Sequence, residues 1–276
     1  MTARAAGGPK FEDVTETTGT PVSAEGAAMI YSRYSYAAEV ARGRRVLELG
    51  CGSGQGFGLV GQAAALLVGG DLSRPLLRAA QRQYGRGVPL VLLSAERLPF
   101  GDGAFDLVLF FEASYYVPDV QSVLREFTRV LAPGGLAVLV NANPERPDFI
   151  GSPHSIHYHT ADELRATLGA LGFRVRVEGA FPVEAPGARG CARWIGATLS
   201  LARRTLQSLG LVPRTLRGRA RLKRLVYGKL RSLPAELLRD FAPLAPRVAV
   251  RPGVVRDFKV IYVTARKATH GADSSP

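Results

Sequence analysis

The sequence predicts a doubly wound α/β fold, with a mostly parallel sheet of seven strands covered by helices on both faces. From Arg45 onward, short continuous apolar runs alternate with amphipathic stretches, a pattern typical of buried parallel strands joined by helices. The first run leads directly into a glycine-rich segment, residues 50–54, which favours a tight turn between a strand and a helix. The predicted strands span residues 46–49, 66–71, 88–93, 105–111, 136–140, 173–177 and 258–264.

The predicted helices are recognised by apolar spacing or by their ends. Residues 120–131 carry apolar side chains three and four positions apart, the spacing of one helix face. The segment 133–135, Pro-Gly-Gly, is expected to stop this helix. Thr160 and Glu163 have the spacing of a capping box, so a helix is expected to start there and to end near Gly172. Two further helices are predicted at 24–41 and 76–84.

The positive charge of the chain is concentrated in one stretch. The 276 residues carry a net charge of +13 within an ordinary globular composition, 46% hydrophobic and 21% charged. Sixteen basic and three acidic residues lie between Arg189 and Asp257, so the remaining residues are balanced. Four interpretations fit this stretch: a solvated helix face, an anionic or carrier-linked substrate, an anionic membrane surface, or RNA. RNA ranks last, because the stretch has only Trp194, Tyr227 and Phe241 as stacking platforms.

Composition also bears on the compartment. Two cysteines, Cys51 and Cys191, are too few for a disulfide framework. No apolar stretch approaches the roughly 20 residues that span a bilayer, and residues 1–10 lack the apolar segment of a signal peptide. We therefore expect a cytoplasmic protein.

The most specific motif is the glycine-rich segment together with Asp71. Glycines let the backbone approach a ligand closely, and an acid about twenty residues further on can accept the hydroxyls of a ribose. The third glycine falls at Gly54, one position earlier than in the dinucleotide-binding pattern, where it would stand at Gln55. This spacing favours a nucleoside without a pyrophosphate.

These motifs resemble those of class I S-adenosylmethionine-dependent methyltransferases. The resemblance covers residues 46–181 and 258–266, and a narrower one, on residues 11–16, 31–34 and 222–230, is to methyltransferases of bacterial polysaccharide and natural-product gene clusters. It implies a Rossmann-like methyltransferase that uses S-adenosylmethionine and releases S-adenosylhomocysteine. The motifs that carry the main resemblance are Glu48 to Gly54, Asp71, Ala95 to Phe100, Phe105 to Val108 and Arg129 to Gly135.

The resemblance also implies a set of cofactor-binding residues. The glycine loop would approach the methionine part of the cofactor, Asp71 would hold the ribose, and Leu72 would pack on the adenine. At position 94 the family commonly has Asp, whereas this chain has Ser94, which can still accept a hydrogen bond. The implied cofactor-binding residues are Tyr31, Glu48, Gly50, Cys51, Gly52, Gly54, Asp71, Leu72, Ser94, Ala95, Glu96 and Phe111.

The chain is accordingly divided into a core and two additions. Residues 1–42 are interpreted as an N-terminal segment and helix over the cofactor, and residues 43–183 with 258–267 as the methyltransferase core. The gap before the last strand, roughly eighty residues, is far longer than usual connections, so residues 184–257 are interpreted as a basic helical cap inserted between strands six and seven. Residues 268–276 are expected to be a disordered tail.

An acceptor site is expected beside the reacting methyl group. The predicted substrate-binding residues are Tyr115, Tyr116 and Asn141; for the two tyrosines, core packing with a satisfied hydroxyl is an equal alternative. Glu112 stands at a strand end, where a carboxylate would need a partner if buried, so a polar function is expected for it.

A hydroxyl acceptor would also need a base. His154, His157 and His159 follow the fifth strand at the sheet edge where α/β folds place ligands. His154 and His157 are candidate bases, with loop hydrogen bonding as the alternative, and His159 is expected to be structural. No carboxylate lies among the three histidines, so no metal is predicted.

The sequence therefore predicts methyl transfer to a hydroxyl of a small molecule, such as a sugar or a secondary metabolite. The alternatives are N-methylation of an amino sugar and a non-catalytic scaffold that binds the cofactor.

Overall fold

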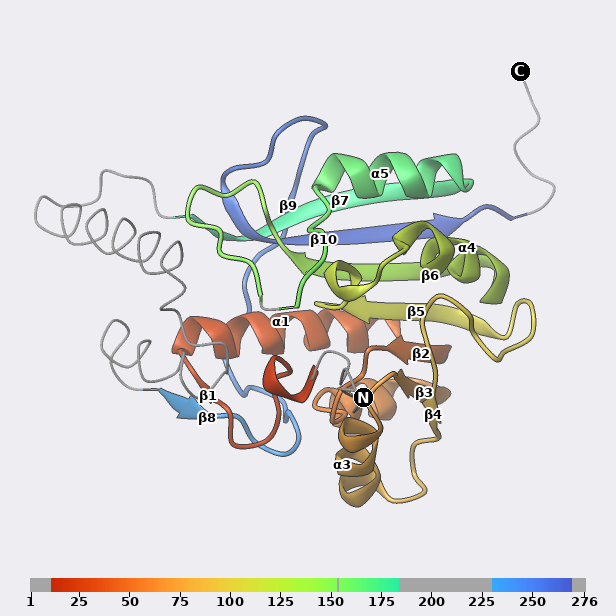
Figure 1. Cartoon of the computed structure of the whole chain (residues 1–276), viewed down its shortest axis with the longest axis vertical. Coiled ribbons are helices and arrows are strands. Elements are labelled where there is room, and N and C mark those ends of the chain that lie inside the picture. Colours follow the sequence, from red (N-terminus) through yellow and green to blue (C-terminus); the bar gives the residue numbers. More distant parts are fainter. Residues whose placement is uncertain (1–10, 153, 184–229, 270–276) are drawn as a thin grey trace, which may run out of the picture.

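The computed structural model describes residues 11–152, 154–183 and 230–269. Its centre is an eight-stranded sheet in the order β4-β3-β2-β5-β6-β10-β7-β9 (Figure 1). The strands are β2 (Arg45–Leu49), β3 (Leu66–Asp71), β4 (Leu90–Leu92), β5 (Phe105–Phe111), β6 (Leu131–Ala142), β7 (Phe173–Pro182), β9 (Val248–Ala249) and β10 (Phe258–Lys267). The helices are α1 (Ala24–Val40), α2 (Phe57–Ala63), α3 (Arg74–Tyr84), α4 (Val120–Val130) and α5 (Ala161–Ala170).

The doubly wound α/β prediction is confirmed. Strands β4, β3, β2, β5 and β6 pair in parallel, whereas β10 runs antiparallel between β6 and β7. All seven predicted strands are present, and the two-residue β9 adds an eighth at the edge beside β7. A separate two-stranded sheet joins β1 (Pro21–Val22) to β8 (Arg231–Ser232).

Alternate residues of the strands feed two apolar cores, one on each face of the sheet. Val46 and Leu107 belong to the core under α1, α2 and α3, whereas Leu47 and Val108 belong to the core under α4 and α5. Successive side chains of a strand point to opposite faces, so these continuous apolar runs cover both faces. Figure 1 shows β5, β6, β10 and β7 lying between α1 and α5.

Side-chain caps fix where several helices begin. The Ser23 hydroxyl accepts a hydrogen bond from the Gly26 amide at the start of α1, and Asp119 does the same for Ser122 at the start of α4. The predicted capping box between Thr160 and Glu163 is confirmed at the start of α5. Such caps satisfy amide groups that have no partner within the helix.

The segment 133–135 does not form the predicted break between a helix and a strand. Helix α4 ends at Val130, and β6 starts at once with Leu131, which pairs with Phe105 of β5. The register shifts between Phe105 and Leu107, and Gly134 takes a positive φ of 75°. The Pro-Gly-Gly segment is therefore an irregularity within a long strand.

The predicted insertion is described only in part. Residues 184–229, with the amphipathic stretch 191–209, lie outside the described residues. Within 230–257 there are two two-residue strands and no helix, so this part does not have the predicted helical character. It packs on α1 instead: the Tyr31 hydroxyl accepts a hydrogen bond from the Asp240 amide, and the Ser32 hydroxyl accepts one from the Ala245 amide.

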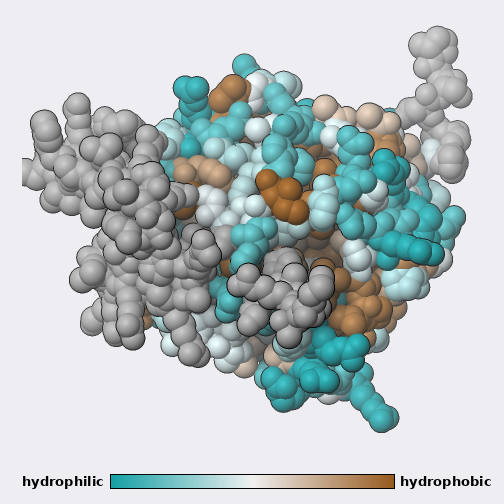
Figure 2. Space-filling model, viewed as in Figure 1, coloured by the Kyte–Doolittle hydropathy of each residue, from teal (hydrophilic) through white to brown (hydrophobic). Residues whose placement is uncertain are grey.

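The described surface has no single large apolar face in the view of Figure 2, where hydrophobic residues form separate small patches. None of the described helices is long and apolar enough to cross a membrane.

Asn143 ties the chain after β6 to the segment that leads into β10. Its amide nitrogen donates to the carbonyls of Val255 and Phe258, at 2.7 and 2.8 Å, and its oxygen accepts from the Glu145 amide at 3.1 Å. Because Asn143 is fully buried, its removal leaves these groups without partners.

We expect Asn143→Ala to lower the free energy of unfolding by about 2–3 kcal/mol, because several buried polar groups lose their partners at once. Asn141→Ala is the matched comparison, since the buried Asn141 has one hydrogen bond, from the Ser114 hydroxyl. Urea unfolding measures both. An equal or smaller loss for Asn143→Ala would contradict the anchoring role.

Candidate functional site

The main cavity lies at the carboxyl edge of the parallel strands. Its volume is about 600 Å³, and its walls come from the loops after β2, β3 and β5, from α1 and from the N-terminal residues 11–16. This is the edge at which open α/β sheets bind ligands.

One wall is the glycine loop after β2. Gly50 and Gly52 have φ values of 66° and 56°, which side chains other than that of glycine rarely adopt. A Cβ added to Gly50 would lie 2.9 Å from the Cβ of Ala113, and one added to Gly52 would lie 3.0 Å from Thr15 Cγ2. The loop therefore needs glycine at both positions, because of its backbone conformation and because Ala113 and Thr15 leave no room for a Cβ.

Asp71 fixes the loop from the end of the next strand. Its Oδ2 accepts a hydrogen bond from the Gly52 amide at 2.8 Å, and its Oδ1 accepts one from the Ser73 amide at 2.7 Å. Burial raises the pKa of Asp71, and these two backbone hydrogen bonds oppose the rise. Each carboxylate oxygen has a further lone pair, so the side chain can also accept hydroxyls of a ribose.

The next part of the wall is largely apolar. Leu72 lines the cavity although its side chain is 59% exposed, and Leu93 and Ala95 line the cavity near it. The Ser94 hydroxyl accepts from the Glu96 amide at 3.3 Å. An apolar surface next to a carboxylate and a glycine-rich loop fits a nucleoside.

Another part of the wall centres on Glu112, directly after β5. This residue has a positive φ of 49°, a conformation that is uncommon for residues with a side chain. Its Oε2 accepts a hydrogen bond from the Tyr115 hydroxyl at 2.8 Å, and its Oε1 lies 4.0 Å from Arg33 Nη1. Burial raises the pKa of Glu112, whereas Arg33 and the bond from Tyr115 lower it.

Arg33 connects this wall to the N-terminal residues. Its guanidinium lies 3.3 Å from the Glu16 carboxylate, and its side chain is only 12% exposed. The Ser73 hydroxyl donates to the carboxylate of Glu12, and the Phe11 ring packs edge-on against Tyr116. Residues 11–16 are thus attached to both sides of the cavity.

Three tyrosines form an aromatic layer beside Glu112. The rings of Tyr115 and Tyr158 stack with centroids 4.1 Å apart, and the Tyr116 hydroxyl donates to Ser152 at 2.6 Å. Tyr115 and Tyr116 both line the cavity.

The structure brings most of the sequence-predicted site residues to this cavity. Those that line it are Gly50, Cys51, Gly52, Asp71, Leu72, Ser94, Ala95, Glu96, Phe111, Glu112, Tyr115 and Tyr116. Their individual roles stay predictions.

Four predicted residues lie behind the wall. The Glu48 carboxylate accepts a hydrogen bond from the Tyr34 hydroxyl, and Tyr31 packs against the segment 240–241. Gly54 lies under the rings of Phe57 and Tyr84, and Asn141 accepts a hydrogen bond from Ser114. None of the four lines the cavity.

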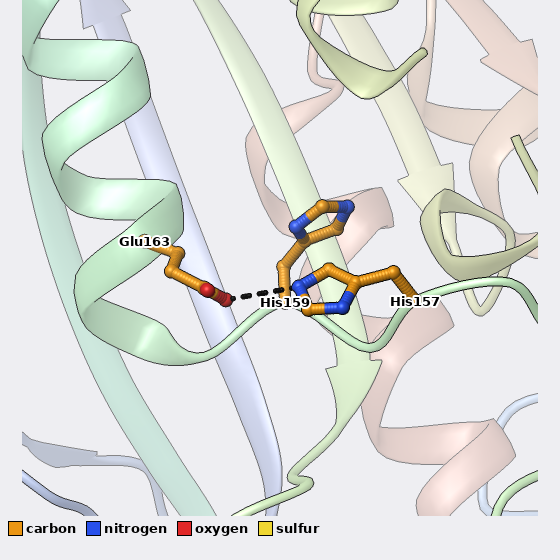
Figure 3. A group of neighbouring side chains, drawn as sticks. All are labelled: His157, His159 and Glu163. Carbon is orange, nitrogen blue, oxygen red and sulfur yellow. Dashed lines mark hydrogen bonds and ion pairs between the residues drawn. The ribbon is translucent and has the colours of Figure 1, made fainter. Parts of the chain in front are cut away.

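The histidines also lie outside the cavity lining. His154 and His157 are exposed, and His157 Nε2 lies 3.4 Å from Glu163 Oε2 (Figure 3). His159 is half-buried, and burial and the neighbouring His157 lower its pKa. The geometry does not support either candidate imidazole as a base, because neither reaches the cavity.

Sequence reasoning missed several cavity residues. Glu16, Arg33, Arg146 and Lys259 all line it. Glu16 and Arg33 stand in segments that carry the narrower resemblance, but no role was assigned to either, and Arg146 and Lys259 lie outside the motifs. Arg33 had one usable signal: it stands among apolar and aromatic residues of a helix, where a lone charge needs a partner.

Glu48 is the most completely enclosed carboxylate near the site. It is 1% exposed, its Oε1 accepts from Tyr34 at 2.8 Å, and its Oε2 has no partner. Burial raises its pKa to about 7, although the bond from Tyr34 and the charge of Arg33 lower it.

Comparisons with known proteins agree on one family. Residues 47–139 match a family model described as a methyltransferase domain. Demethylmenaquinone methyltransferase of Thermus thermophilus is 33% identical over 168 residues, which are 49% of this chain and 76% of that protein. Phthiotriol/phenolphthiotriol dimycocerosates methyltransferase 1 of Mycobacterium ulcerans is 38% identical over 120 residues, 40% of this chain and 44% of that protein. The chain spans about half the length of the first curated relatives it matches, from 44% to 54%.

Solved structures share the fold at low sequence identity. An S-adenosylmethionine-dependent methyltransferase from Archaeoglobus fulgidus has a TM-score of 0.55 at 16% identity, and the match covers 89% of this chain and 95% of that protein. The YcgJ protein of Bacillus subtilis has a TM-score of 0.54 at 18% identity, with 86% and 99% covered.

The environment of Glu48 predicts a pH dependence of stability. Its pKa is about 7 in the folded chain, above its usual value of 4.5. The folded state therefore binds more protons between these values, and the free energy of unfolding falls as the pH rises through them. From pH 5 to pH 8, we expect wild type to lose about 2 kcal/mol more than Glu48→Gln, as measured by urea unfolding. A difference between the two proteins that does not change with pH would contradict this.

Proposed function

The chain belongs to the class I S-adenosylmethionine-dependent methyltransferases, and we propose that it transfers the methyl group to a hydroxyl of a small molecule. The observation that carries the hydroxyl assignment is the half-buried Glu112 carboxylate in the cavity wall. Among the predicted acceptors, a secondary metabolite with an apolar skeleton is favoured over a sugar, because Met29, Ile30 and Ile150 also line the cavity.

The glycine loop and Asp71 are the proposed cofactor-binding elements. S-adenosylmethionine supplies a methyl group already activated by its positively charged sulfur. In the bound cofactor, Asp71 would hold the ribose hydroxyls, and the backbone at Gly50 and Gly52 would approach the methionine part. Leu72 and Leu93 offer the apolar surface for the adenine. This assignment is supported by the two glycines that line the cavity and by the carboxylate that is held in place by two amides.

Glu112 is the proposed general base. A hydroxyl nucleophile must lose its proton as it attacks, and a base is most effective when its pKa lies near the working pH. Burial raises the pKa of Glu112 in that direction. The Tyr115 hydroxyl occupies Oε2, so Oε1, which lies toward Arg33 at 4.0 Å, is the oxygen proposed to take the proton.

Arg33 and residues 11–16 complete the proposed acceptor chamber. The charge of the Arg33 guanidinium lowers the pKa of Glu112 and so favours the ionised carboxylate, which is the form that accepts a proton. The contact between Phe11 and Tyr116 covers the same side. This supports the described residues 11–42 of the N-terminal segment as the part of the chain that lies over the bound cofactor and excludes water from it; residues 1–10 lie outside the described residues.

Cofactor binding tests the role proposed for Asp71. Asp71→Ala should weaken S-adenosylmethionine binding about 10- to 100-fold, because hydrogen bonds to a charged group contribute about 1.5–3 kcal/mol. Isothermal titration calorimetry measures the change. Asp102→Ala is the control, because Asp102 is an exposed carboxylate outside the cavity lining. Unchanged binding in Asp71→Ala would remove the ribose assignment.

The rate of methyl transfer tests Glu112 as the base. Glu112→Gln should lower kcat about 10²- to 10⁴-fold, the usual contribution of a general base, while S-adenosylmethionine still binds. Transfer of a labelled methyl group to a panel of apolar alcohols, sugars and amino sugars gives the readout. Glu39→Gln, an exposed position of α1 outside the cavity lining, is the control.

The pH profile separates a base from a structural role. Wild-type kcat/KM should rise with pH through the pKa of Glu112, because the base acts when ionised. Tyr115→Phe removes the hydrogen bond that lowers this pKa, so the rise should move to higher pH. Full activity of Glu112→Gln would contradict the base. Transfer to amines alone would favour N-methylation, and cofactor binding with no transfer to any acceptor would favour a scaffold.

A further inference from the structure

Two histidines and a glutamate come together on the surface beside the cavity wall. His157 and His159 project from the segment before α5, and Glu163 reaches back toward them from the first turn of the helix (Figure 3). One ligand atom from each of the three lies within 4.8 Å of the others. The two imidazole rings are 4.5 Å apart and nearly perpendicular.

This donor set has the chemistry of a transition-metal site. Two imidazole nitrogens and a carboxylate oxygen are typical ligands of Zn²⁺ when a water fills the fourth position. In a tetrahedral site with bonds of about 2.0–2.1 Å, neighbouring ligand atoms lie about 3.3 Å apart. His157 Nε2 and Glu163 Oε2 are 3.4 Å apart, and both side chains are exposed.

The capping role of Glu163 is compatible with a metal ion. Its Oε2 accepts the Thr160 amide at 2.8 Å, which holds the carboxylate in one orientation. A carboxylate has about four lone-pair positions on its two oxygens, so an ion and the Thr160 amide can share it. The cap thus orients the ligand in advance, as outer hydrogen bonds do in many metal sites.

The same segment forms the back of the proposed acceptor wall. The Ile156 amide donates to the Tyr115 carbonyl at 2.7 Å, and the Tyr158 ring, between the two histidines in sequence, stacks on Tyr115. We propose that His157, His159 and Glu163 bind a zinc ion, which anchors this segment to α5 and so holds Tyr158 against Tyr115. The ion lies outside the cavity and takes no part in methyl transfer.

Zinc binding to the full chain, produced without a histidine tag and stripped with a chelator, tests the site. Calorimetry with Zn²⁺ should show one ion per chain. His157→Gln, His159→Gln and Glu163→Gln should each weaken binding about tenfold or more, since even the loss of an outer partner costs 10- to 100-fold. Gln at position 163 can still form the capping box, so this variant removes the charged ligand and keeps the helix start.

His154→Gln is the matched control, because His154 is exposed in the same segment but does not belong to the group. With Co²⁺ in place of Zn²⁺, the visible absorption spectrum should show tetrahedral coordination in wild type and in His154→Gln, but not in the three ligand variants. Near-ultraviolet circular dichroism should change on Zn²⁺ addition in the same two proteins, because Tyr158 and Tyr115 become more fixed. Absence of zinc binding in wild type, or equal binding in all variants, would overturn the proposal whether or not the chain transfers methyl groups.

Discussion

Three neighbouring strands each bring a carboxylate into the interior at one edge of the sheet. Glu48 lies near the end of β2, Asp71 ends β3 and Glu112 follows β5. Burial raises the pKa of all three. Burying a charged group without partners is costly. The segments around this edge of the sheet must therefore supply each carboxylate with hydrogen-bond donors or a positive charge. Asp71 accepts backbone amides from its own loop and the glycine loop. Glu48 accepts from Tyr34 of α1, and Glu112 accepts from Tyr115 and also lies near Arg33 of α1.

The dependence on α1 explains why the N-terminal part of the chain belongs to the site. Adjacent residues of this helix serve two strands: Tyr34 donates to Glu48, and Arg33 lies near Glu112. Arg33 in turn holds Glu16, so residues 11–16 follow the helix onto the cavity. The contact between α1 and the sheet is thus partly polar. Through Arg33, it connects residues 11–16 at the cavity to the carboxylate of Glu112.

The sequence predicted what local patterns determine and missed what distant contacts determine. The strands, the glycine loop and the capping box at Thr160 depend on neighbouring residues, and the structure contains them where expected. The pairing of Arg33 with Glu112 joins positions 79 residues apart in the chain, and no spacing rule gives it. The histidines were expected at the cavity because they follow a strand at the edge of the sheet where α/β folds bind ligands. The segment instead bonds to Tyr115 through the backbone of Ile156 and presents Tyr158 inward, which leaves His157 on the surface.

The net charge of +13 raises the question of whether the acceptor is anionic. The charged side chains that line the cavity help to answer it. Three basic side chains line the cavity, and each has an acidic neighbour: Arg33 lies near Glu16, Arg146 lies 3.6 Å from Asp148, and Lys259 lies 2.6 Å from Glu25. The described cavity is therefore balanced within itself and does not require an anionic acceptor. An anionic or carrier-linked acceptor is favoured only by the basic stretch between Arg189 and Asp257, most of which lies outside the described residues. The two ideas are separable: the cavity favours an apolar molecule with a hydroxyl, and the basic stretch bears on what that molecule is attached to or which surface delivers it.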